Sequence, residues 1–241
     1  MICAPSRALL ATALLALAFG TAPAQTPTRA ERQLSRLDLG ISGSGEFTRK
    51  VSGPILPTGA SNCYLPSPTI PHTGPCTTIL SQSASNTLGA LATVRYIAKP
   101  LVGLEFNYGW ARYTQAFTPA PATPADPSSV YPIQTTYNEY SFGYLITPAH
   151  TILGLQPFAS AGAGTTYFKP TGGGGEGEHK QARAVYYYNI GVQQEFHDSH
   201  FGVRASFRQV FLLAPDFGEN YLTIKQHTNT IQPTAGFYLR F

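Results

Sequence analysis

Apolar and polar residues alternate along eight separate stretches of the chain, and this alternation limits the possible folds more than any other feature. In the clearest stretch the apolar positions are Leu104, Phe106, Tyr108 and Trp110. The residues between them are Glu105, Asn107 and Gly109. A period of two residues places successive side chains on opposite faces of a strand, whereas a helix has a period of 3.6. The sequence therefore predicts an all-β protein.

With their flanking residues the eight stretches predict strands of roughly ten to twelve residues, which is enough for a tilted strand to cross a bilayer. They lie at about 37–47, 87–96, 104–110, 139–146, 157–168, 186–195, 201–211 and 231–241. In the fifth stretch, Pro157 to Phe168, small residues occupy both faces. The sequence therefore does not decide which face of this strand points outward.

The connections between the predicted strands alternate in length. The short ones lie at about 97–101, 147–156 and 197–200, and the long ones at about 50–85, 115–134, 169–182 and 213–227. Outer-membrane barrels have short turns on the periplasmic side and longer loops outside. We therefore predict an eight-stranded antiparallel up-and-down transmembrane β-barrel with short periplasmic turns and four long extracellular loops.

Nine charged residues of the predicted strands share the face opposite the apolar residues. They are Asp38, Glu46, Arg95, Glu105, Glu139, Glu195, Arg204, Arg208 and Arg240. An arginine that faces lipid at the bilayer centre costs on the order of 2–4 kcal/mol, so we assign these residues to the lumen. The interior of an eight-stranded barrel is just wide enough to be filled by side chains. We expect a plug of ion pairs, and a narrow ion path is the alternative.

Ring side chains near the strand ends are predicted to lie on the outer face at the two membrane interfaces. These interfacial aromatic residues are Phe47, Trp110, Tyr137, Tyr167, Phe196, Phe201 and Phe241. Arg112 follows Trp110 at the outer end of its strand, where a lipid headgroup would accept its charge. A soluble periplasmic barrel that turns its apolar face inward around an apolar ligand remains an alternative.

The first residues of the chain are typical of an export signal. Arg7 precedes an apolar run that ends at Phe19, and Ala22-Pro23-Ala24 is a small-x-small cleavage pattern. We predict a cleaved signal peptide at 1–24, a short periplasmic lead-in at 25–36 and the barrel domain at 37–241. In the oxidising compartment that this implies, Cys63 and Cys76 are predicted to form a disulfide, with two free thiols as the alternative.

Composition and motifs argue against several function classes. Of 16 basic residues, Arg7 leaves with the signal, and the remaining 15 against 12 acidic residues give a net charge of +3, too little to indicate a nucleic-acid partner. The run Gly172 to Gly175 lacks the lysine and hydroxyl residue of a phosphate loop. The six histidines fall in predicted loops or turns. We therefore predict no cofactor, no metal site and no catalysis.

The sequence resembles the bacterial outer-membrane β-barrel proteins of the OmpA-like membrane-domain type. The resemblance is carried by the export signal, by the segment PFASAGAG at 157–164 and by the last strand. In that class the last strand follows a polar-x-Gly-x-x-apolar-x-aromatic pattern, matched by Thr234, Gly236, Leu239 and Phe241. The resemblance implies insertion into the outer membrane of a Gram-negative-type bacterium, among its lipids, by the barrel-assembly machinery, which reads these four residues.

Together these features predict an integral outer-membrane barrel with a structural or surface-interaction role. A narrow pore for small solutes or ions is one alternative. A lipid-modifying barrel enzyme, with a catalytic site assembled from loops, is another. The long loops are suited to bind a surface partner, but the sequence does not identify it.

Overall fold

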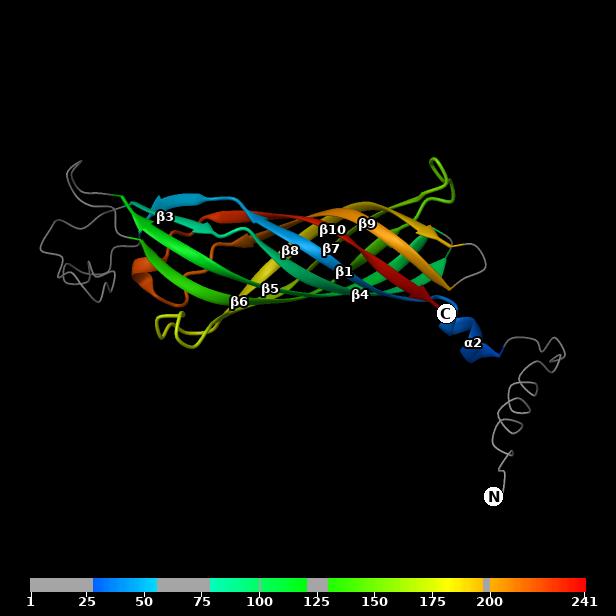
Figure 1. Cartoon of the computed structure of the whole chain (residues 1–241), viewed down its shortest axis with the longest axis horizontal. Helices are drawn as coiled ribbons and strands as arrows, with labels where there is room; N and C mark the ends of the chain where they lie inside the picture. The colour runs from blue at the N-terminus through cyan, green and yellow to red at the C-terminus, as the bar shows by residue number, and fades with distance from the viewer. Residues whose placement is uncertain (1–27, 56–78, 100, 121–129, 197–199) are drawn as a thin grey trace, which may run out of the picture. The chain divides into compact units, whose positions relative to one another are not determined.

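The computed structural model describes residues 28–55, 79–99, 101–120, 130–196 and 200–241 (Figure 1). The chain divides into two compact units, residues 1–34 and residues 35–241. In the first unit, helix α2 (Arg29–Leu34) begins with a capping box. The Glu31 carboxylate accepts from the Thr28 amide at 2.6 Å, and the Thr28 hydroxyl accepts from the Glu31 amide at 3.2 Å. No described helix is long and apolar enough to cross a membrane.

Eight strands of the second unit close into an antiparallel ring. They are β1 (Leu37–Thr48), β4 (Thr87–Lys99), β5 (Val102–Pro119), β6 (Tyr131–Ile146), β7 (Gln156–Pro170), β8 (Gln181–Glu195), β9 (Phe201–Leu213) and β10 (His227–Arg240). Around the ring their order is β5-β4-β1-β10-β9-β8-β7-β6, and pairing of β5 with β6 closes it. The last strand pairs with the first, as in Leu39 opposite Leu239. This confirms the predicted eight-stranded barrel.

Two further strands, β2 (Val51–Pro54) and β3 (Ile79–Ala84), extend the wall where the sequence predicted a loop. Glu46 near the end of β1 pairs with Thr87 at the start of β4. Val51 lies five residues after Glu46, and it pairs with Gln82, which lies five residues before Thr87. The two pairs share one register, so β2 continues β1 and β3 leads into β4. The wall is also taller than predicted because β5 runs to Pro119 and β6 begins at Tyr131.

The connections distinguish the two ends of the barrel. The segments that follow β4, β6 and β8 join one end and are short, at 100–101, 147–155 and 196–200. The segments at 49–86, 120–130, 171–180 and 214–226 join the opposite end and are longer, with β2 and β3 inside the first. We call these the short-turn end and the long-loop end.

Buried and exposed side chains alternate along the barrel strands, because one face meets the lumen and the other the surroundings. In β5, for example, Glu105 is 1% exposed and Phe106 is 43% exposed. The same alternation decides the open question for β7. There Phe158, Ser160 and Thr166 are buried in the lumen, while Tyr167 is exposed.

Candidate functional site: the barrel lumen

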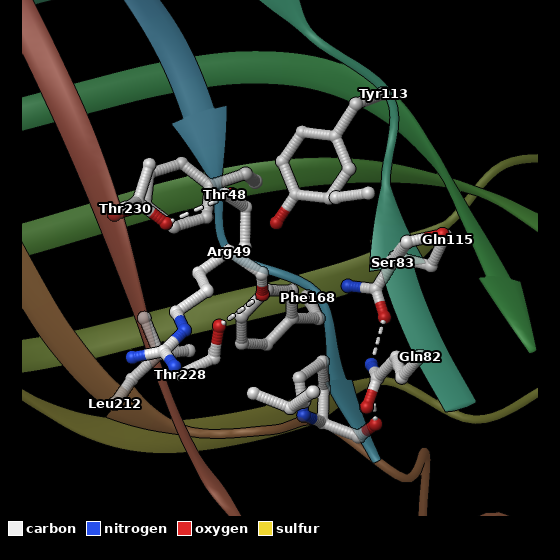
Figure 2. A pocket seen from close by; sticks show the side chains of 14 residues that line it. Thr48, Arg49, Gln82, Ser83, Tyr113, Gln115, Phe168, Leu212, Thr228 and Thr230 are labelled. Carbon is white, nitrogen blue, oxygen red and sulfur yellow. Dashed lines mark hydrogen bonds between the residues drawn. The ribbon is translucent and has the colours of Figure 1, made fainter. Parts of the chain in front are cut away.

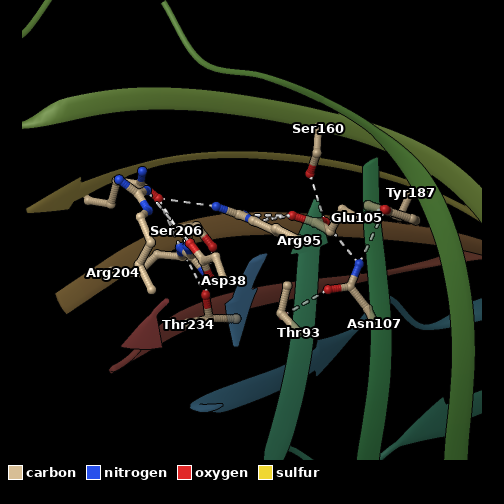
Figure 3. A network of polar contacts seen from close by, with 12 residues as sticks. Asp38, Thr93, Arg95, Glu105, Asn107, Ser160, Tyr187, Arg204, Ser206 and Thr234 are labelled. Atoms are coloured by element: carbon tan, nitrogen blue, oxygen red, sulfur yellow. Dashed lines mark hydrogen bonds and ion pairs between the residues drawn. The ribbon is translucent and has the colours of Figure 1, made fainter. Parts of the chain in front are cut away.

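Two buried arginine–carboxylate pairs lie in the lumen on the side of the short-turn end (Figure 3). Arg95 binds Glu105, with 2.6 Å between Nη2 and Oε2. Arg204 binds Asp38, also with 2.6 Å between Nη2 and Oδ2. The Gln193 amide oxygen accepts from both guanidinium groups, at 3.2 Å from Arg95 Nη1 and 3.0 Å from Arg204 Nη2. One neutral side chain therefore joins the two pairs into one cluster.

Neutral side chains also contact the charged groups of the Arg95–Glu105 pair. Glu105 Oε1 accepts hydrogen bonds from Asn107 at 2.9 Å and from Ser160 at 3.0 Å. The Arg95 guanidinium stacks 4.1 Å from the centre of the Phe158 ring. Buried charges are tolerated only when they are paired and hydrogen-bonded in this way, because the cost of removing them from water is large.

A third buried pair lies closer to the long-loop end. Both carboxylate oxygens of Glu139 accept from Arg208, and the Tyr137 hydroxyl also donates to Glu139. Gln232 accepts from Arg208 and donates to Glu46 at 2.7 Å, which brings a second carboxylate into the cluster. A centrally placed Tyr187 connects this cluster to the first one. Its ring lies 4.4 Å from the Arg208 guanidinium carbon, and its hydroxyl donates to Glu105 at 3.3 Å.

The last two residues of the predicted charge network lie nearer to solvent. Arg240 and Glu195 are joined at the short-turn end by a 2.7 Å contact, with side chains 22% and 41% exposed. All nine predicted charges therefore take part in the lumen clusters or in this rim pair. The sequence pattern did not identify the neutral residues Gln193, Gln232 and Tyr187, because nothing distinguishes them from other inward polar residues.

Six of the predicted interfacial aromatic side chains are exposed on the barrel: Phe47, Trp110, Tyr167, Phe196, Phe201 and Phe241. The prediction for Tyr137 is wrong. Its side chain is buried in the lumen, where the hydroxyl donates to Glu139. Tyr137 lies two residues from Glu139 on the same strand face, and this spacing was the sequence signal for an inward ring.

Between the third pair and the long-loop end, the lumen contains a small cavity of about 20 Å³ (Figure 2). Its lining includes Tyr137, Phe168, Tyr113 and Thr48. A cavity needs roughly 10–15 Å³ to hold a water molecule, so this space has room for about one. It is too small for a solute.

An apolar core closes the lumen beyond this cavity. It combines strand residues such as Leu80, Phe117 and Ile133 with residues of the β9–β10 connection. That connection, at 214–226, contains the 3-10 helix η2 (Asn220–Leu222) and buries Phe217 and Leu222 completely or nearly so. The connection therefore caps the barrel from within at the long-loop end.

Asp216 anchors this cap to the wall. Its carboxylate accepts hydrogen bonds from Gln181 and Thr223 and pairs with Arg183 at 2.8 Å. Burial by itself would raise the pKa of the Asp216 carboxyl. The hydrogen bonds from Gln181, Gly218 and Thr223 and the charge of Arg183 outweigh burial and lower this pKa below its usual value.

Three of the four residues predicted as an assembly signal belong to β10, and Phe241 directly follows its last residue. Thr234 and Gly236 face the lumen, while Leu239 and Phe241 are exposed, and the Phe241 amide donates to the Leu37 carbonyl at 3.3 Å. Cys63 and Cys76 lie outside the described residues. Within the described ranges, no three His, Cys, Asp or Glu side chains gather as a metal site requires.

A closed barrel with an apolar outer face and a lumen filled by paired charges is the architecture of a membrane-spanning β-barrel. The model of the family "Outer membrane protein beta-barrel domain" matches residues 11–237, and the chain belongs to this family of bacterial outer-membrane proteins.

Several solved structures resemble the chain at low identity. Neisserial surface protein A is 11% identical with a TM-score of 0.44, and the match covers 84% of this chain and 97% of that one. The attachment invasion locus protein Ail of Yersinia pestis, solved with a heparin analogue, is 14% identical with a TM-score of 0.36, covering 85% and 99%. AlkL is 13% identical with a TM-score of 0.40, covering 84% and 90%. No curated protein sequence matches the chain.

Proposed function

We propose that the protein is a closed, non-conducting and non-catalytic barrel with a structural or surface-interaction role in the outer membrane. Its long-loop end faces the cell exterior, and its short-turn end faces the periplasm. Outer-membrane lipids surround it, and the barrel-assembly machinery inserts it by reading β10. The long connections other than the cap at 214–226 are the part of the molecule available to a surface partner.

The observation that carries this proposal is that paired charges and an apolar cap fill the lumen, apart from a cavity with room for about one water molecule. Three buried ion pairs block it at two levels: Arg95–Glu105 and Arg204–Asp38 form one cluster, and Arg208–Glu139 lies closer to the long-loop end. The apolar cap formed by 214–226 covers the long-loop end. A conducting pore needs a wet path past charged groups, whereas each of these six side chains is buried and paired with an opposite charge.

The pore alternative is tested by conductance in planar bilayers. Folded wild-type protein, checked by its different gel migration before and after boiling, should give a silent bilayer. Stable single-channel currents that disappear when Glu105 and Arg208 are substituted would support the pore and refute the plug.

The structural and surface roles are separated by complementing a null strain. A variant with 172–179 replaced by a Gly–Ser linker keeps the barrel strands and changes one long connection, including the Glu178 carboxylate that accepts from Tyr131 and Tyr221. Restored detergent resistance with this variant supports a structural role, whereas failure with a normal amount of folded barrel assigns the role to the surface. If lipid A acyl chains differ between null and complemented cells, a lipid-modifying enzyme replaces both.

A further inference from the structure

The outer face of β5, β6 and β7 carries two rows of side chains close to the long-loop end. In the upper row Arg112 lies opposite Thr136, which lies opposite Lys169; in the lower row Trp110 lies opposite Asn138, which lies opposite Tyr167. Partners in register on neighbouring strands share one face of a sheet. We call these six residues the outer patch: Arg112, Thr136, Lys169, Trp110, Asn138 and Tyr167.

The upper row is cationic and has no acidic neighbour on its face. Neighbouring strands lie about 4.8 Å apart, so the backbones of Arg112 and Lys169 are separated by about 10 Å with the Thr136 hydroxyl between them. Arg112 donates to Gln134 at 2.7 Å, which restrains its guanidinium. Among the described residues neither cation pairs with a carboxylate, and the outward positions of β5, β6 and β7 hold no Asp or Glu. This row is complementary to anionic groups.

The lower row combines rings with an amide. Trp110 and Tyr167 flank Asn138, whose side-chain oxygen accepts from Tyr108 at 3.0 Å. The ring of Tyr140 lies 6.1 Å from that of Tyr167 and continues the aromatic surface toward the middle of the wall. From the long-loop end toward the middle of the wall, the outer face therefore presents cations and a hydroxyl, then rings and an amide, then an apolar surface.

That order matches the order of groups in a lipid with a phosphorylated sugar headgroup. We propose that the outer patch binds a phosphorylated glycolipid of the outer leaflet. Arg112 and Lys169 bind its phosphates, Thr136 and Asn138 bind sugar hydroxyls, and the acyl chains lie along the surface below. The inference rests on the proposed orientation, in which the long-loop end faces outward, because phosphorylated glycolipid is the anionic lipid of that leaflet.

Trp110 is the only tryptophan of the chain, so its fluorescence reports on the outer patch alone. Folded protein in detergent is titrated with bis-phosphorylated lipid A, and Kd is read from the Trp110 signal. A cation near an anionic lipid surface contributes about 1 kcal/mol, so the double variant Arg112→Gln/Lys169→Gln should bind roughly 30-fold more weakly. The matched control Lys50→Gln/Lys225→Gln removes two exposed cations outside the patch and should bind like wild type.

Phosphatidylglycerol at equal negative charge serves as the second probe. Weaker binding of this lipid than of lipid A is expected if the two rows recognise a phosphorylated sugar. Equal Kd values for the two lipids would overturn the assignment, and so would unchanged lipid A binding by the Arg112/Lys169 variant. Heat-modified gel migration confirms that each variant is folded. Binding in detergent depends on neither orientation nor conductance, so its failure would leave the proposed function standing.

Discussion

Glu139→Gln tests whether the lumen is dry. Arg208 and Glu139 are 1% and 0% exposed, and the substitution keeps the shape of the side chain while it removes the counter-charge of Arg208. Removing one partner of a buried pair costs about 3–5 kcal/mol, because the remaining charge stays buried without compensation. A solvated pair contributes only about 0.2–1 kcal/mol. We therefore expect the free energy of unfolding to fall by about 3–5 kcal/mol.

The measurement is equilibrium unfolding of the barrel in lipid vesicles by urea, with Trp110 fluorescence as the signal. Glu195→Gln is the matched control, because the same chemical change is made in the rim pair with Arg240, where Glu195 is 41% exposed. It should cost at most about 1 kcal/mol. The double variant Glu139→Gln/Arg208→Met removes both charges and should recover most of the loss, since replacing a whole buried pair is often close to neutral.

The reasoning fails if Glu139→Gln costs no more than Glu195→Gln. Such a result would mean that water reaches the Arg208 guanidinium and screens it. The lumen would then be hydrated at its centre, the ion-pair plug would be refuted, and the pore would become the favoured function.

Three further changes have defined outcomes. Deletion of Phe241 should lower the yield of assembled barrel without blocking export across the inner membrane, measured by fractionation; normal yield would contradict the role assigned to β10. The pKa of the Asp216 carboxyl is lowered in the folded protein. The stability that its ionised form gives to the cap is therefore present above the ordinary pKa of 3.8 and is lost as the pH falls through the folded pKa. Asp216→Asn should thus speed hydrogen exchange in 214–226 at pH 7, and its difference from wild type should shrink as the pH falls below 3.8; equal exchange at pH 7 would refute the anchor. Gly162→Ala places a Cβ 2.2 Å from a backbone oxygen and should cost about 1–3 kcal/mol in urea unfolding. A Cβ added at Gly43 would meet no atom within 4 Å, so Gly43→Ala is the control. An equal loss of unfolding free energy in Gly43→Ala would refute the steric explanation.

The eight barrel strands were predictable because each has two different surroundings. A residue that faces lipid and a residue that faces the lumen are under opposite constraints, so the alternation is strong wherever a strand is regular. The charges locate the lumen face directly, as with Glu105 and Arg208. Rings are a weaker guide, since a tyrosine is equally suited to an interface and to a polar lumen in which its hydroxyl has a partner. Tyr137 was placed wrongly for this reason.

The strand extensions were missed because two short breaks change which face points inward. Even-numbered residues such as Glu46 are buried in β1, but the odd-numbered Gly53 is buried in β2 after the break at 49–50. A break at 85–86 separates Gln82 of β3 from Arg95 of β4 in the same way. Across each break the period of two loses its phase, and a paired strand then resembles a loop.

The cap at the long-loop end had no periodic signal. Phe217, Leu222 and Ile224 are separate apolar residues in a segment with glycine, proline and charged neighbours, which is the composition of an exposed loop. They are buried because the taller wall leaves an apolar space between the Arg208 cluster and the long-loop end, and the β9–β10 connection fills it. Local sequence sets the strands, but the size of the space left inside the closed ring decides which connection folds into it. The closure of this barrel is therefore a tertiary property that depends on the wall and on 214–226 together.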